Sequence, residues 1–152
     1  KRLAIISVHG TLDMAYPPLI LATAALAMDM EAAIFFTFYG LEIVKKGNAD
    51  KLLVAPIANP AMPIPVPNII GMLPGMTGMA TGMMNSWMKK ANVAKLSELL
   101  EMAVEGGVRL IACQMSMDVM GIKKEDLIDG IEVSGAATFI SYASENAICL
   151  SF

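Results

Sequence analysis

Short apolar runs, each followed by a stretch with a helical pattern, constrain the fold of this chain more than any other feature. The first run, Leu3–Val8, has no charged residue and ends at a histidine and a glycine. Uninterrupted apolar runs of this length are typical of strands that are buried on both faces of a parallel sheet. The later runs that predict strands are Ala32–Phe38, Val108–Cys113, Gly130–Val133 and Ala147–Phe152.

Helical patterns separate these runs. Leu19–Met30 is rich in helix formers and nearly free of charge, and Pro17 and Pro18 before it suit the first turn of a helix. Strands that alternate with helices predict a doubly wound α/β domain. The further predicted helices or helical turns are Leu41–Lys46, Leu96–Glu105, Met115–Met120, Lys123–Leu127 and Ala136–Ser144.

The segment between the two halves, Leu52–Met88, carries no charged residue. Its first part is interrupted by prolines and is expected to be extended, whereas a helix is predicted from about Met76 onward. Pro74 and four glycines make it a poor membrane span. We therefore expect one domain over residues 1–152, with an apolar Met/Gly/Pro-rich insert at about 52–88. Contacts between subunits are the favoured role of this insert, and a peripheral membrane contact is the alternative.

Composition excludes several classes of function. The chain has 152 residues, a net charge of −3 and 56% hydrophobic residues, and no basic block, so nucleic-acid binding is not expected. Its two cysteines, Cys113 and Cys149, form no disulfide framework, and the single His9 has no partners for a metal site. These features indicate a reducing, cytoplasmic compartment and predict no metal and no cofactor. The short apolar start is read as a strand, not as a signal peptide.

Ligands of open α/β sheets bind at the carboxyl ends of the strands, near the switch in strand order. Cys113 ends a predicted strand and precedes a helix, whose amide groups and dipole favour the thiolate. A buried core thiol is the competing interpretation for Cys113, and for Cys149 the core is preferred. Both interpretations of Cys113 remain open at this point. The candidate site centres on Cys113, and its predicted lining residues are His9, Gly10, Thr11, Tyr39, Gln114 and Met115.

The other polar residues near these strand ends have ordinary explanations. His9 would favour a thiolate if the first and third strands were neighbours, although a hydrogen bond to loop backbone is the alternative. Asp13, or Thr11, is expected to cap the first helix, and Asp118 is expected in the first turn of its own helix. Tyr16 and Tyr39 are candidates for the mouth of the same site.

Four stretches resemble the DsrE/DsrF-like family, and in particular its DsrE-like sulfurtransferase subgroup, which is also labelled peroxiredoxin family protein. They are "GTLDMAYPPLILA", "FFTFYGL", "NPAMPIPVPNIIGMLPGMTGMATGMM" and "IACQMSMDVMGIKKEDLIDG". The resemblance implies a flavodoxin-like or Rossmann-like three-layer sandwich with a mainly parallel sheet. It also implies a homo-oligomer, a trimer or a hexamer, without a prosthetic group.

For function, the resemblance implies sulfur trafficking through a persulfide on Cys113, the cysteine inside the matching motif. The expected partners are sulfur-carrier proteins such as TusA-like or rhodanese-like proteins. A non-catalytic oligomeric or membrane-associated adaptor that acts through the apolar insert is the alternative. A thiol peroxidase is disfavoured, because it needs a polarising residue such as an arginine, and Arg109 lies at the far end of the strand of Cys113.

Overall fold

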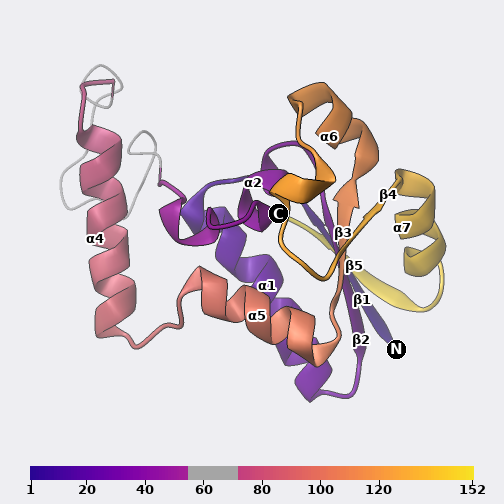
Figure 1. Ribbon diagram of the computed structural model, residues 1–152. Coiled ribbons are helices and arrows are strands. Elements are labelled where there is room, and N and C mark those ends of the chain that lie inside the picture. Colours follow the sequence, from indigo (N-terminus) through magenta and orange to yellow (C-terminus); the bar gives the residue numbers. More distant parts are fainter. Residues whose placement is uncertain (55–71) are drawn as a thin grey trace.

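The computed structural model describes residues 1–54 and 72–152 (Figure 1). Its strands form one parallel sheet in the order β4-β3-β2-β1-β5. The predicted α/β fold is confirmed, and every strand lies within two residues of its expected bounds. The strands are β1 (Arg2–Ser7), β2 (Glu31–Phe36), β3 (Arg109–Cys113), β4 (Ile131–Ser134) and β5 (Ala147–Ser151).

Helices cover the two faces of the sheet unequally. Both α1 (Leu12–Ala27) and α5 (Leu96–Gly106) lie on one face, and α7 (Ala136–Ala143) lies on the other (Figure 1). Right-handed crossovers explain this division. The steps from β1 through β2 and β3 to β4 all run in one direction, so their helices lie on one face, whereas the step from β4 back to β5 runs in the other.

Strand residues alternate between two buried clusters. Leu3, Ile5, Ile34 and Leu110 belong to the larger cluster, together with the buried sides of α1 and α5. The alternate positions on the sheet form the smaller cluster under α7, where the rings of Phe35 and Phe139 stack with centroids 5.2 Å apart. Its buried members are Ala4, Phe35, Ile111, Cys113 and Phe139. The candidate thiol therefore faces α7 and not the main core.

Helix α1 begins seven residues earlier than the predicted Leu19, so that boundary was wrong. Pro17 and Pro18 lie inside the helix instead of in its first turn, and each removes one amide donor from the helical ladder. The apolar side of α1, which includes Leu12 and Leu19, is buried on the sheet and offsets this loss. At the amino end, the amide of Leu12 donates to the carbonyl oxygen of Leu53 at 3.0 Å.

The middle of the chain leaves the sheet and carries a projecting helix. Three short turns follow β2, namely η1 (Phe38–Gly40), α2 (Leu41–Val44) and η2 (Ala49–Lys51). The next described helix is α4 (Met76–Lys90). The helix expected from about Met76 is confirmed, whereas the expectation of an extended, proline-punctuated segment falls mostly on residues 55–71, outside the described part. Helix α4 stands at the outer edge of the molecule, beyond α1 and α5 (Figure 1).

Two further short elements follow β3, namely α6 (Gln114–Met120) and the turn η3 (Lys124–Asp126). Over residues 1–54 and 72–152, no helix combines the length and the apolar character that crossing a bilayer requires.

Gly40 tests how tightly η1 packs on the end of β1. A Cβ at Gly40 would overlap the carbonyl oxygen of Ser7, which belongs to the backbone and cannot turn away. We expect Gly40→Ala to lower the free energy of unfolding by about 1–3 kcal/mol, measured by urea denaturation. The matched control is Gly82→Ala on α4, where no described atom outside the adjacent helix backbone lies within 4 Å of the added methyl group. This control should gain about 0.5–1 kcal/mol, and equal effects at the two positions would contradict the packing.

Candidate functional site

Cys113 occupies the carboxyl end of β3 and the N-cap position of α6. Only 4% of the residue is exposed. Burial raises the pKa of its thiol, but hydrogen bonds from the Ser116 hydroxyl and amide, the Thr37 hydroxyl and the Met115 amide lower it. Together these bonds outweigh burial, so the thiol pKa lies below its ordinary value. Helix α6 has only seven residues, and these nearby donors therefore explain the shift better than a helix dipole does.

Two of the hydroxyl groups that lower this pKa are bonded to each other. The oxygen atoms of Thr37 and Ser116 are 2.8 Å apart, and Ser116 is fully buried. Neither residue was among the predicted site residues. The serine three positions after a strand-end cysteine was a usable signal, because the third helical position points back toward the N-cap residue. Nothing local in the sequence pairs Thr37 with Ser116, since β2 and β3 are far apart along the chain.

The end of β1 fixes the position of Thr37. The Thr37 amide donates to the carbonyl oxygen of Ser7 at 3.0 Å, and the Gly40 amide donates to those of Thr37 and Val8 at 3.0 and 2.9 Å. Between them, Phe38 has a φ of 48°, which is the left-handed region that an aromatic residue rarely occupies. Such strain persists only where the surroundings impose it, and it is common at functional sites.

The predicted lining residues lie at the same edge of the sheet, but most of them are exposed. Gly10 approaches the carbonyl oxygen of Tyr39 so closely that a Cβ would overlap it. The α6 helix packs against η1, which brings Met115 to the rim of the site, where it is 61% exposed. Tyr39 is 68% exposed, His9 and Gln114 are exposed, and Thr11 is partly buried.

His9 is not placed to act on the thiol through a neighbouring strand. Strand β2 separates β1 from β3, so the condition stated for His9 is not met. The reversal in strand order lies between β1 and β5, because β5 returns to the far side of β1. Cys113 on β3 is therefore at a carboxyl strand end, two strands away from this switch point.

Cys149 is exposed, so its assignment to the core was wrong. It lies on β5, which is an edge strand with no buried residue. The sequence run looks like an interior strand, but position in the sheet decides burial. Tyr16 is also outside the site, because its hydroxyl donates to the carbonyl oxygen of Ala94 at 3.0 Å, next to α5.

Two acidic residues differ from their expected roles. Asp13 is exposed in the first turn of α1 and makes no side-chain cap, and Thr11 at the N-cap position makes none either. Asp118 lies beyond the first turn of α6, where its carboxylate accepts a hydrogen bond of 2.9 Å from the Gln114 amide group. Because α1 and α6 begin earlier than expected, both positions shifted relative to the helix ends.

Arg109 lies at the opposite end of β3 from Cys113, as expected, and is engaged there by Glu132. Two nitrogen atoms of its guanidinium group donate to the carboxylate of Glu132, each at 2.8 Å. This ion pair holds the pKa of the Glu132 carboxyl below its usual value. Arg109 is therefore not available to polarise a peroxide at the thiol, and the peroxidase reading gains no support from the geometry.

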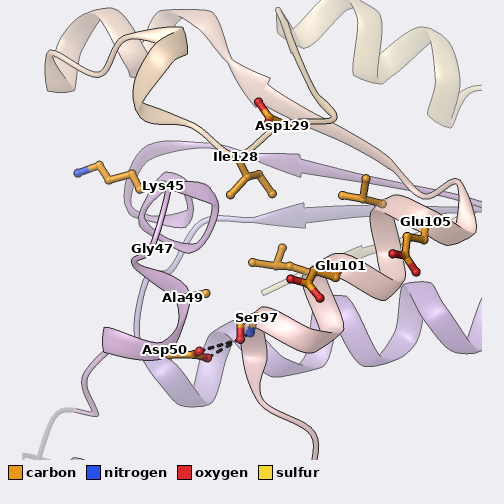
Figure 2. Close-up of a pocket in the computed structure, with 11 residues that line it drawn as sticks. Lys45, Gly47, Ala49, Asp50, Ser97, Glu101, Glu105, Ile128 and Asp129 are labelled. Atoms are coloured by element: carbon orange, nitrogen blue, oxygen red, sulfur yellow. Dashed lines mark hydrogen bonds between the residues drawn. The ribbon is translucent and has the colours of Figure 1, made fainter.

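A separate cavity of about 420 Å³ lies on the other face of the sheet (Figure 2). Apolar side chains such as Leu100 and Ile128 line it and belong to the main core cluster, and Glu101 and Glu105 of α5 stand at its edge. Asp50 is already engaged, because its carboxylate accepts hydrogen bonds from the hydroxyl and amide of Ser97 at 2.7 and 3.2 Å. None of the predicted site residues lines this cavity. Across residues 1–54 and 72–152, histidine, cysteine and acidic side chains form no group of three that could hold a metal ion.

Comparison with known proteins places these features in a family. The model of the DsrE/DsrF/DrsH-like family matches residues 1–151. The chain is 47% identical to "Sulfur carrier protein DsrE2" of Allochromatium vinosum, covering 99% of the chain and 97% of that protein. It is also 36% identical to the uncharacterized protein YrkE of Bacillus subtilis, over 99% of the chain and 96% of that protein.

Two solved structures share the fold at low sequence identity. Protein MTH1491 of Methanobacterium thermoautotrophicum, described as of unknown function, has a TM-score of 0.56 at 11% identity, with 99% of this chain and 98% of that chain covered. The ychN protein of E. coli has a TM-score of 0.51 at 12% identity, with 99% of each chain covered. The flavodoxin-like α/β fold is thus shared, and the match of the family model over nearly the whole chain shows that the chain belongs to the DsrE/DsrF/DrsH-like family.

Proposed function

We propose that the protein is a sulfur carrier that holds sulfur as a persulfide on Cys113. The observation that carries this proposal is the thiol at the end of β3, whose pKa is lowered by hydrogen bonds from Thr37, Ser116 and Met115. The thiolate is the nucleophile of sulfur transfer, so a lowered pKa raises its fraction at neutral pH. A sulfur-trafficking role agrees with the name of the Allochromatium vinosum relative.

The transfer is a balanced exchange between two thiols. The Cys113 thiolate attacks the outer sulfur of a donor persulfide, R–S–SH. One S–S bond forms, the S–S bond of the donor breaks, and the donor leaves as the thiolate R–S⁻. The product, Cys113–S–SH, later yields its outer sulfur to an acceptor thiolate by the same exchange. No electrons are gained or lost overall, so the cycle needs no redox cofactor.

The donors and acceptors in this proposal are protein thiols, in the manner of TusA-like and rhodanese-like carriers. A protein thiolate reaches Cys113 at the rim formed by Tyr39, Gln114 and Met115, with His9, Gly10 and Thr11 on the adjoining loop. The chain acts in the cytoplasm as a single domain with its apolar insert. It assembles as a homo-oligomer, for which we propose a trimer or a hexamer.

Intact-mass measurement tests the carrier directly. We expect the Cys149→Ser variant to gain one sulfur atom after incubation with glutathione persulfide, because Cys113 then is the only thiol. Addition of a reductant should remove the adduct. The double variant Cys113→Ser, Cys149→Ser is the matched control and should gain nothing. A sulfur adduct on the double variant, or no adduct on Cys149→Ser, would contradict the assignment of the persulfide to Cys113.

The pH dependence of alkylation tests the lowered pKa. When folding lowers the pKa of a thiol, its thiolate persists to lower pH. The rate of alkylation should therefore stay high below the usual thiol pKa of about 8.5. We therefore expect the iodoacetamide rate of Cys149→Ser to fall only at a pH below that range. The Cys113→Ser variant, in which only the exposed Cys149 reacts, is the internal reference. An inflection for Cys113 above the one for Cys149 contradicts the proposal.

A second candidate function has one observation in its favour, namely the projecting helix α4. Met79 is 54% exposed and Trp87 is 38% exposed, and Lys89 and Lys90 follow at its carboxyl end. Apolar and aromatic side chains beside lysines suit an assembly surface or the interface of a membrane. In this reading the chain is an oligomeric or membrane-associated adaptor, and Cys113 has no catalytic part.

The double variant Met79→Gln, Trp87→Gln tests the adaptor. Both side chains are exposed, so the fold should persist while the apolar surface of α4 is lost. We expect a smaller particle by light scattering, or reduced sedimentation with vesicles of anionic lipid. Met102→Gln on α5, which is 53% exposed, is the control for a general loss of surface apolarity. Wild-type behaviour of the double variant in both assays would dismiss this function.

A further inference from the structure

The outer edge of β5 is one of the two edges of the sheet, and within the described residues no strand pairs with it. Its inner edge is bound to β1. The amide of Phe152 donates to the carbonyl oxygen of Ile6 at 2.8 Å, and the carbonyl oxygen of Phe152 accepts from the Val8 amide at 2.7 Å. At the other end, the Arg2 amide donates to the carbonyl oxygen of Asn146 at 3.2 Å. The even-numbered residues of this segment therefore direct their backbone groups toward β1.

Backbone groups alternate in direction along a strand, so the odd-numbered residues of β5 direct theirs away from the sheet. These residues are Ala147, Cys149 and Ser151. Each adds one amide donor and one carbonyl acceptor to the free edge. Such an edge is a template for a further strand, and proteins usually protect it with charged residues, prolines or bulges. Strand β5 has no charged residue and no proline, and its register with β1 is unbroken.

We propose that this edge binds β5 of a second copy of the chain, in antiparallel orientation about a two-fold axis at Cys149. This centre pairs all five residues of β5, and any other centre leaves some of them unpaired. Cys149 then lies opposite itself, Ala147 lies opposite Ser151, and Ile148 lies opposite Leu150. The inference rests on the proposed homo-oligomeric state and not on the persulfide chemistry at Cys113.

The side chains of β5 are complementary to each other in this register. Ile148 is 47% exposed, although it is on the side of the sheet that faces the main core. In the pair it meets Leu150 of the second copy, so an exposed apolar side chain is covered by another apolar side chain. Small side chains meet on the other face, and no like charges are brought together. This match of the edge with itself favours a second copy over a strand of another protein.

The two-fold axis restricts the size of the particle. An isologous interface joins chains in pairs, so the particle contains an even number of chains. A hexamer can be built from three such pairs, whereas a trimer cannot contain one. Each pair has five residues on a side, fewer than the roughly 20–30 of a standard interface. Three pairs that act together within one hexamer offset this small size, because the later contacts form inside the same particle.

Disulfide cross-linking tests the register. Opposed residues of a hydrogen-bonded antiparallel pair have Cα atoms about 5.5 Å apart, which a disulfide can bridge. In Cys113→Ser, where Cys149 is the only thiol, we expect diamide to produce a covalent dimer that dithiothreitol returns to monomer. The matched control is the triple variant Cys113→Ser, Cys149→Ser, Ser151→Cys. Its thiol lies on the same face of β5, but the two copies are offset by about 13 Å along the strands, so no dimer should form.

A pair of unlike variants completes this test. Ala147→Cys and Ser151→Cys, each without the native cysteines, should not cross-link alone. Their co-expressed mixture should cross-link, because the two residues lie opposite each other. Absence of a cross-link at Cys149, or equal cross-linking by Ser151→Cys alone, would overturn the pairing and leave the edge to a strand of another protein.

The particle mass tests the interface without a cysteine. Ile148→Lys places a charge opposite Leu150, in the way that natural edge strands avoid pairing. We expect sedimentation equilibrium to show half the mass of the parent, a trimer in place of a hexamer. Met102→Lys on α5, where Met102 is 53% exposed, is the matched control and should keep the mass of the parent. A parent with an odd number of chains, or an unchanged mass of Ile148→Lys, would overturn the proposal.

These outcomes are distinct from those that test the sulfur carrier. Sulfur uptake by the Cys149→Ser variant is measured by intact mass, whatever the size of its particle. If that variant takes up sulfur while Cys113→Ser forms no cross-link, the carrier function stands and the β5 pair fails. If the cross-link forms at Cys149 without sulfur uptake at Cys113, the pair stands and the carrier function fails.

Discussion

The parallel register of β1, β2 and β3 is the constraint on which the candidate site depends. Ser7 lies opposite Phe36, and Phe36 lies opposite Ala112, so the three strands end at one level of the sheet. This register places Thr37 one residue beyond β2 and Cys113 at the end of β3. A shift by one residue would move Thr37 to the opposite face of the sheet and separate it from Ser116. The chemistry of the thiol is thus set by backbone pairing between segments that are distant in sequence.

Much of the fold could be predicted because burial leaves a simple mark on the sequence. Each predicted strand is an apolar run, and a run such as Leu3–Val8 predicts a strand from its own residues, whichever strands pair with it in the sheet. The start of α1 could not be predicted in this way, because Pro17 and Pro18 suggest a first turn when the chain is read locally. Packing of Leu12 against the sheet outweighs that local preference.

The errors at the site arise from strand order, which sequence patterns do not contain. The run around Cys149 is as apolar as that of an interior strand, yet β5 is at the edge and the thiol is exposed. His9 could act on the cysteine only if β1 and β3 were neighbours, but β2 lies between them. Cys113 ends a strand and starts a helix, as predicted, and its role in sulfur transfer stays a prediction. Ser116 carried a local signal, while Thr37 required the register of β2 against β3.

The left-handed conformation of Phe38 has a consequence that reaches beyond the loop. A residue in this region costs about 1–3 kcal/mol, and the hydrogen bonds that Thr37 and Gly40 make to the end of β1 offset that cost. The same hydrogen bonds to β1 fix the position of Thr37, whose hydroxyl lowers the pKa of Cys113. The acidity of the Cys113 thiol therefore depends on β1 as well as on β3. A substitution that weakens β1 would raise the pKa of the thiol although it changes no residue beside the sulfur.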